Sequence, residues 1–264
     1  MDLHLEQKHV LITGGSKGIG LACAEGFLTE GARVTLVSRS ADNLEKAKIH
    51  LTKSFPSAAL HLVAANLSDA AQAEQAIANA VSALGPIDVL VNSAGAAKRT
   101  PPNELTAAAW HDAMDAKYFS YIHVLGPVTA AMAARGKGSV VNVIGAGGKV
   151  ANPIHMPGGA ANAALMLVTA GMAAAYAGQG VRVNAVNPGQ TLTERLKEGM
   201  AAQARMEGTD MAEAQQKATA RIPMGRMAKP EEIANAVLFL ASDQASYISG
   251  VVVTMDGVSN PIVV

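Results

Sequence analysis

The sequence predicts a single α/β domain in which a doubly wound, seven-stranded parallel sheet carries helices on both faces. First, short β-rich runs alternate with longer helical patterns along all 264 residues. Second, the β-rich runs are almost continuous in Val, Leu and Ile, which is typical of strands covered on both faces. Third, no internal repeat, low-complexity tract or linker divides the chain. Residues 1–264 are therefore expected to form one domain.

The alternation defines each expected element in turn. The expected strands are 9–14, 33–38, 59–65, 87–92, 139–144, 181–187 and 251–255. The expected helices are 18–30, 41–54, 69–84, 104–135, 159–178 and 230–242. Some helices begin on a recognisable signal. Ser68 and Asp69 precede the third helix as caps, and Pro230 suits the first turn of the sixth.

Composition excludes several classes of protein. The charges of the 21 basic and 21 acidic residues cancel, and the sequence has no basic run that could bind a nucleic-acid backbone. No nucleic-acid partner is therefore expected. Half of the residues are hydrophobic, which is enough for a large core and for an interface in a homo-oligomer. The single cysteine, Cys23, cannot form an internal disulfide. We expect no metal site.

Two segments bear on localisation. The first ten residues carry charges where a signal peptide would be apolar, so a cytoplasmic protein is expected. Residues 160–178 are uncharged and nearly long enough to cross a bilayer. They are rich in Ala, include Asn162 and lie between expected strands, so we predict a buried helix at a subunit interface and no membrane association.

Residues 190–228 interrupt the alternation with a long polar segment that also contains methionines. This length exceeds what a connection between a strand and a helix requires. Ligands of doubly wound sheets bind outside the carboxyl ends of the strands, from which this segment departs. We predict a lid over the substrate site; a solvated helical excursion is the alternative.

The stretch TGGSKGIG, residues 13–20, joins the first expected strand to the first expected helix. Gly14, Gly18 and Gly20 allow a tight turn, and the free N–H groups of the helix can then bind a diphosphate. Ser16, Lys17 and Ile19 belong to the same loop and are further candidate contacts. This position predicts the dinucleotide site of a Rossmann fold.

The end of the second expected strand reads Ser38, Arg39, Ser40. NAD sites usually place an acidic residue there, whereas a guanidinium binds the 2′-phosphate of NADP. Arg39, assisted by Lys17, therefore favours NADP(H) over NAD(H).

With these motifs in place, the chain resembles the short-chain dehydrogenase/reductase family over essentially its whole length. Besides TGGSKGIG, the resemblance is carried by NLSD (66–69), NSAG (92–95), NPGQTLT (187–193) and the run 225–257. It implies a bound nicotinamide dinucleotide and usually a tetramer, with a dimer as the other assembly considered. The coenzyme contacts that it adds are Asn66, Leu67, Asn92, Ala94, Gly95, Pro188, Gly189 and Thr191.

The resemblance also implies four catalytic residues, Asn, Ser, Tyr and Lys. By unbroken spacing, these positions hold Lys117, Gly145, Gly158 and Asn162 respectively. The usual proton-transfer residues are thus replaced. The glycines would leave a hollow with free N–H groups able to bind an oxyanion or carboxylate, and close helix packing is the alternative.

Lys117 stands at the position of the family's Asn, and Asn162 stands at the position of its Lys, so the amine and the amide have changed places. We hypothesise that Lys117 is the remaining charged group and a proton carrier; a lysine reaching out to solvent is the alternative. His155 is a second, weaker candidate because histidine titrates near neutrality.

The sequence therefore predicts an NADP(H)-dependent oxidoreductase that transfers a hydride between nicotinamide and a small carbonyl or hydroxyl compound. Two alternatives stay open, because fold alone does not determine function. One is a catalytically inert NADP-binding sensor or partner subunit. The other is a non-redox lyase or isomerase on the same scaffold.

Overall fold

The computed structural model describes residues 1–95, 99–194, 196–197, 200–201, 204 and 208–262. Its strands form one parallel sheet in the order β3-β2-β1-β4-β5-β6-β7. The chain starts in the middle of the sheet, builds outward to β3, returns beside β1 as β4 and then builds outward to β7. The strand order reverses between β1 and β4, and doubly wound proteins bind ligands at the carboxyl edge beside such a point. The predicted seven-stranded doubly wound sheet is confirmed.

The strands lie within two residues of their predicted ranges. They are β1 (His9–Thr13), β2 (Arg33–Ser38), β3 (Leu60–Ala64), β4 (Val89–Asn92), β5 (Gly138–Val143), β6 (Val181–Pro188) and β7 (Val252–Met255). Most positions of β1, β2, β4, β5 and β6 are buried, as strands covered on both faces require.

Most helices also follow the prediction. They are α1 (Gly18–Thr29), α2 (Ala41–Ser54), α3 (Ala70–Leu84), α6 (Met156–Tyr176) and α9 (Pro230–Ala241). A further helix, α8 (Met211–Thr219), lies in the segment 190–228, where no helix range was predicted. The single helix expected over 104–135 is wrong in detail. A 3-10 turn, η1 (Pro102–Glu104), precedes α4 (Ala107–Ala113), a π-helical segment η2 (Met114–Phe119) follows, and α5 (Ser120–Ala134) completes the run. Apolar periodicity does not register the extra residue that a π-turn inserts.

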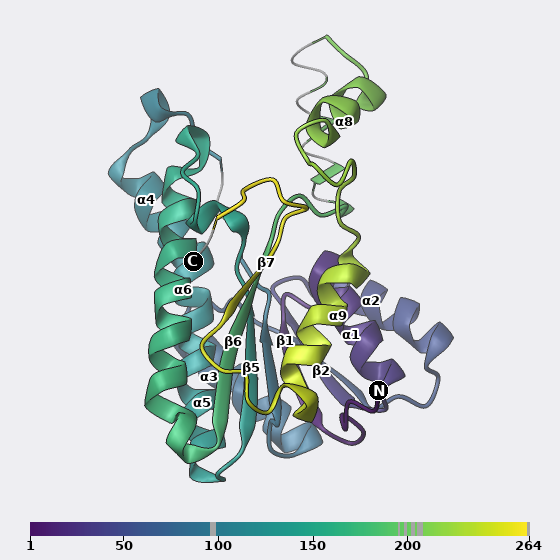
Figure 1. Ribbon diagram of the computed structural model, residues 1–264. Coiled ribbons are helices and arrows are strands. Elements are labelled where there is room, and N and C mark those ends of the chain that lie inside the picture. Colours follow the sequence, from purple (N-terminus) through teal and green to yellow (C-terminus); the bar gives the residue numbers. More distant parts are fainter. Residues whose placement is uncertain (96–98, 195, 198–199, 202–203, 205–207, 263–264) are drawn as a thin grey trace.

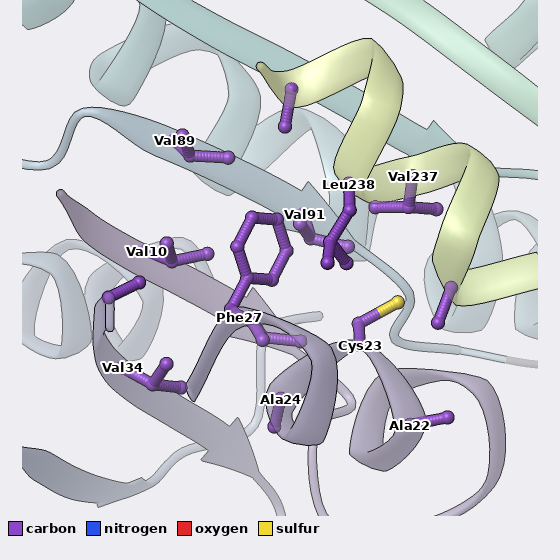
Figure 2. Packing of buried hydrophobic residues seen from close by; sticks show 14 of the residues in the cluster. Val10, Ala22, Cys23, Ala24, Phe27, Val34, Val89, Val91, Val237 and Leu238 are labelled. Atoms are coloured by element: carbon purple, nitrogen blue, oxygen red, sulfur yellow. The ribbon is translucent and has the colours of Figure 1, made fainter. Parts of the chain in front are cut away.

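Two helical layers enclose the sheet, with α1, α2 and α9 on one face and α3, α5 and α6 on the other (Figure 1). Figure 2 shows Phe27 of α1 and Leu238 of α9 packed together over Val10 and Val91 of the sheet. A Cβ atom on Gly26 would lie 3.0 Å from a methyl carbon of Leu238, so glycine sets the close approach of α1 and α9.

The long helix is only partly covered by the rest of the chain. Pro153–Gln179, which contains α6, is long and apolar enough to cross a bilayer, but length and composition are weak evidence for a span. Only 28% of its most apolar window is buried, and Leu167 is 77% exposed. Within the chain the sheet covers only one stripe of α6, and burial of its other side at a subunit interface stays a prediction.

The predicted lid, 190–228, begins at the end of β6 and contains α8. Figure 1 shows α8 projecting beyond the carboxyl ends of the strands. Residues 195, 198–199, 202–203 and 205–207 of this segment lie outside the described residues. Its role as a lid stays a prediction.

Candidate active site

The loop between β1 and α1 has glycines where a side chain has no room. Gly14 has a φ of +66°, and a Cβ atom there would lie 2.7 Å from the carbonyl oxygen of Ser93. A Cβ atom on Gly20 would overlap the carbonyl oxygen of Gly14. No described side chain caps the first turn of α1, so its N–H groups are available to an anion. The predicted loop thus has the shape and polarity of a phosphate site.

Two cations stand beside this loop. Ser16 Oγ donates a hydrogen bond of 3.0 Å to Ser38 Oγ, which ties the glycine loop to the end of β2. Lys17 and Arg39 follow these serines directly, and both are exposed. Ile19, by contrast, packs against the core and anchors the start of α1. The cations are positioned to bind a 2′-phosphate next to the diphosphate.

The residues that follow β4 lie against the glycine loop. Thr13 Oγ1 accepts hydrogen bonds from the backbone N–H groups of Ser93 and Ala94, at 3.1 and 3.2 Å. It also donates to Asn92 Oδ1 at 3.3 Å. Gly95 has a φ of +83°, and a Cβ atom there would overlap the carbonyl oxygen of Ala116. Of the predicted contacts, Asn92 is buried and structural, while Ala94 and Gly95 line the edge.

Asn66 and Leu67, which follow β3, differ in the direction of their side chains. Asn66 is exposed, and its Oδ1 accepts from the backbone N–H of Ser68 at 3.3 Å. Leu67 is buried in the core, and its carbonyl oxygen bonds His123 Nδ1 at 3.0 Å. Only Asn66 therefore presents its side chain at this edge.

The segment after β6 reaches back to the glycine loop. Gly189 follows Pro188, and a Cβ atom on it would lie 2.8 Å from Asp256 Cα. Thr191 is buried, and its backbone pairs with Ala228. A Cβ atom on Gly18 would lie 3.0 Å from Thr193 Cγ2, so the segment packs directly over the phosphate loop.

Lys117 is buried, with 6% of its surface exposed. Its Nζ donates to Tyr121 Oη at 2.8 Å and to the carbonyl oxygen of Val143 at 3.1 Å. It also lies 4.4 Å from the centre of the Tyr121 ring, within cation–π range. Val143 ends β5, two residues before Gly145. Lys117 thus points inward to the carboxyl edge of the sheet, and the alternative of a lysine reaching solvent is wrong.

The π-helical segment η2 carries Lys117. Ser120 Oγ donates to the carbonyl oxygens of Ala116 and Lys117, at 3.0 and 3.1 Å. Ser68 Oγ donates to the carbonyl oxygen of Asp115 at 3.1 Å. Hydroxyl groups therefore satisfy carbonyls of the irregular turn, and such turns are frequent at functional sites.

Asn162 lies against the turn that follows β5. A Cβ atom on Gly145 would lie 3.2 Å from Asn162 Nδ2, and Gly145 has a φ of +136°. Asn162 is 6% exposed, and its Oδ1 has no hydrogen-bond partner among the described residues. The backbone N–H of Gly145 donates to Asn187 Oδ1 at 2.9 Å. The amide of Asn162 thus occupies the side of Gly145 on which a side chain would stand.

His155 ends the 3-10 turn η4 (Pro153–His155), just before α6. A Cβ atom on Gly147 would lie 3.2 Å from its Cδ2 atom, so its ring packs beside the same turn. Gly158 is buried in the first turn of α6, which begins three residues earlier than predicted. His155 and Asn162 therefore both lie against the segment 145–148.

The structure thus brings Lys117, Asn162 and His155 to the end of β5. Sequence analysis missed Tyr121, which lies on α5 and not on the helix of Gly158. The signal that could have found it is its spacing, four residues after Lys117, which places two helical side chains side by side. Among the described residues, no group of His, Cys, Asp or Glu side chains could hold a metal ion.

The parallel sheet, the glycine loop and its cations define the class: a dinucleotide-binding protein of the Rossmann type. A family model described as "Enoyl-(Acyl carrier protein) reductase" matches residues 14–258. The chain belongs to this family, within the short-chain dehydrogenases/reductases.

Individual relatives agree over nearly the whole chain. A 2-(S)-hydroxypropyl-CoM dehydrogenase of Xanthobacter autotrophicus is 37% identical, over 97% of this chain and 98% of its own length. L-sorbose reductase from Gluconobacter frateurii, solved with NADPH and L-sorbose, superposes with a TM-score of 0.93 at 29% identity, covering 100% of both chains. A short chain oxidoreductase from Pseudomonas aeruginosa PAO1, solved with NADPH and described as "containing an atypical catalytic center", has a TM-score of 0.88 at 30% identity, covering 97% and 98% of the two chains. The chain is an oxidoreductase of the short-chain type.

Proposed function

We propose that this oxidoreductase uses NADP(H) to interconvert a carbonyl and a hydroxyl group of a small molecule, with Lys117 as a non-standard proton carrier. The observation that carries the proposal is the buried ammonium group of Lys117 at the carboxyl end of β5. The proposed substrate is a small or medium-sized carbonyl or hydroxyl compound.

Coenzyme binding rests on the first half of the sheet. The glycine loop and the uncapped start of α1 would hold the diphosphate, and Arg39 with Lys17 would hold the 2′-phosphate. NADPH in the L-sorbose reductase and in the P. aeruginosa oxidoreductase supports the choice of NADP(H). When bound, the nicotinamide supplies or accepts the hydride.

Proton transfer is assigned to the residues near the end of β5. In the reducing direction, Lys117 would give a proton from Nζ to the forming alkoxide and be left as an amine. The buried position of Nζ at the end of β5 supports this assignment. Asn162 would offer its buried, unpartnered Oδ1 to a hydroxyl donor. The atypical centre of the P. aeruginosa relative supports chemistry without the usual residues.

Assembly and location complete the proposal. The exposed apolar face of α6, with Leu167 at its centre, supports a homo-oligomer, either a tetramer or a dimer. We also propose a cytoplasmic location and no membrane partner.

The test is oxidation of NADPH, followed by nicotinamide absorbance, with a panel of carbonyl compounds. Once a substrate is found, Lys117→Met is expected to lower kcat by about 10²- to 10⁴-fold, the usual contribution of a proton carrier. Lys137→Met, at the opposite end of β5, is the matched control and should retain kcat.

Each other outcome overturns one part. Normal turnover in Lys117→Met removes Lys117 as the proton carrier, and a loss of turnover in His155→Phe alone transfers that role to His155. NADPH binding without turnover on any compound favours a sensor or partner subunit. Turnover without added nucleotide favours a lyase or isomerase.

A further inference from the structure

Tyr121 is the one described tyrosine whose hydroxyl group contacts Lys117. Its side chain is completely buried. Its Oη accepts from Lys117 Nζ at 2.8 Å and donates to the carbonyl oxygen of Val143, which Lys117 also contacts. Lysine ammonium, phenol and carbonyl therefore form a closed triangle at the end of β5.

This triangle does not make Tyr121 a proton donor to substrate. Burial raises the pKa of its hydroxyl group well above the ordinary value of 10.0. The hydroxyl proton is already donated to Val143, and the side chain has no exposed surface. A phenol in this environment stays neutral and serves as a fixed hydrogen-bond acceptor for Lys117.

The backbone around Lys117 makes the contact possible. The π-helical segment η2 ends at Phe119, and Tyr121 lies in the first turn of α5, where the helix is regular again. Gly95 leaves room for the displaced carbonyl group of Ala116, and Ser120 binds that carbonyl. The irregular turn therefore directs Lys117 into the fold, while the regular turn after it supplies the acceptor.

We propose that Tyr121 is a positioning residue that fixes the ammonium group of Lys117 at the carboxyl end of β5. The inference rests on the proposed function for its consequence in catalysis, and on the contact itself for its physical basis. Two hydrogen bonds and the face of the Tyr121 ring hold Nζ, and a lysine held in one geometry transfers a proton without first reorganising.

The test measures the contact without any substrate. In protein labelled with ¹⁵N at lysine Nζ, Lys117 should give an amino signal protected from exchange with water, identified by its loss in Lys117→Met. Tyr121→Phe should accelerate that exchange at least tenfold. Tyr118→Phe is the matched control, because Tyr118 contacts Phe119 by its ring and forms no hydrogen bond among the described residues. It should leave the exchange unchanged.

Turnover adds a second readout. Tyr121→Phe should lower kcat at least fivefold and leave the NADPH dissociation constant within twofold of the wild-type value. Unchanged exchange in Tyr121→Phe would overturn the inference. Rapid exchange of Lys117 in the wild type would also overturn it, and this measurement does not depend on the folding of any variant. Absence of NADPH turnover in the wild type would instead overturn the proposed function, and exchange would still decide whether Tyr121 holds Lys117.

Discussion

The coenzyme half of the sheet, β1 to β4, and the catalytic half, β5 to β7 with α4 to α6, differ in how their chemistry is built. The coenzyme half presents backbone N–H groups and glycines, with two cations at its rim. The proposed catalytic half instead brings side chains together, with Lys117, Asn162 and His155 near the end of β5. Phosphate recognition through the backbone depends on chain geometry, whereas a proton carrier can move to a neighbouring helix if its atom still reaches the same place. The difference teaches that backbone geometry dominates the first half and side-chain packing the second.

The largest expected effect comes from Gly95→Ala, at the boundary between the halves. Its methyl group would overlap the carbonyl oxygen of Ala116, and alanine is strained at a φ of +83°. We expect a loss of about 2–4 kcal/mol in the free energy of unfolding, from overpacking and strain together. Denaturant unfolding measures it. Gly126→Ala, which meets no atom within 4 Å, should cost nothing; equal stability of both variants would show that the boundary is not tightly packed.

Gly145→Ser tests whether restoring the serine that the family resemblance implies at this position restores turnover. The new side chain would press on the amide of Asn162, and the φ of +136° is unfavourable for serine. We expect a loss of about 1–3 kcal/mol in unfolding free energy and no gain in turnover. A stable variant with higher kcat would contradict the view that Gly145 and Asn162 fit each other.

Arg39→Ala tests the rim of the coenzyme half. Loss of one charge-assisted contact to the 2′-phosphate should weaken NADPH binding about tenfold and leave NADH binding nearly unchanged. Titration of nucleotide fluorescence measures both. Lys46→Ala, an exposed lysine on α2, is the control. Equal weakening of NADPH and NADH would argue against a 2′-phosphate contact.

The smallest effect concerns His9, buried at the amino end of β1. Its Nδ1 bonds the carbonyl oxygen of Gly85 at 2.7 Å and its Nε2 bonds Thr35 Oγ1 at 2.9 Å. Desolvation by burial lowers the pKa of His9 below the ordinary value of 6.5, despite the Gly85 bond that raises it.

The unfolded chain therefore takes up a proton first as the pH falls. The contribution of His9 to the free energy of unfolding is present above pH 6.5 and declines as the pH falls below it. Urea unfolding of the wild type and of His9→Gln between pH 7.5 and about 5 checks this. The same pH dependence in both proteins would contradict it.

The sequence predicted the fold well because its signals are local and physical. Apolar runs mark strands buried on both faces, and a glycine turn between the first strand and helix fixes the phosphate loop. Arg39 follows a predicted strand and Lys17 lies in the predicted glycine loop, so their neighbourhood could be predicted, and their contact with a 2′-phosphate stays a prediction.

The catalytic half was predicted only in part. Lys117 was identified from its spacing, but its direction depends on a π-turn that periodicity does not reveal. The contact with Tyr121 joins that turn to the first turn of α5, and the fit of Asn162 against Gly145 joins segments apart in the chain. Composition alone also does not say which face of α6 the sheet covers, so that stripe could not be predicted.

The most direct test of the account is calorimetric titration of NADPH into the wild type, Lys117→Met and Gly20→Val. We predict that Lys117→Met binds NADPH within about threefold of the wild type, because its side chain belongs to the half that transfers the proton. Gly20→Val should bind at least about 100-fold more weakly, because its side chain would displace the phosphate loop. A loss of NADPH affinity in Lys117→Met as large as that in Gly20→Val would contradict the separation of the two halves. So would the absence of measurable NADPH affinity in the wild type.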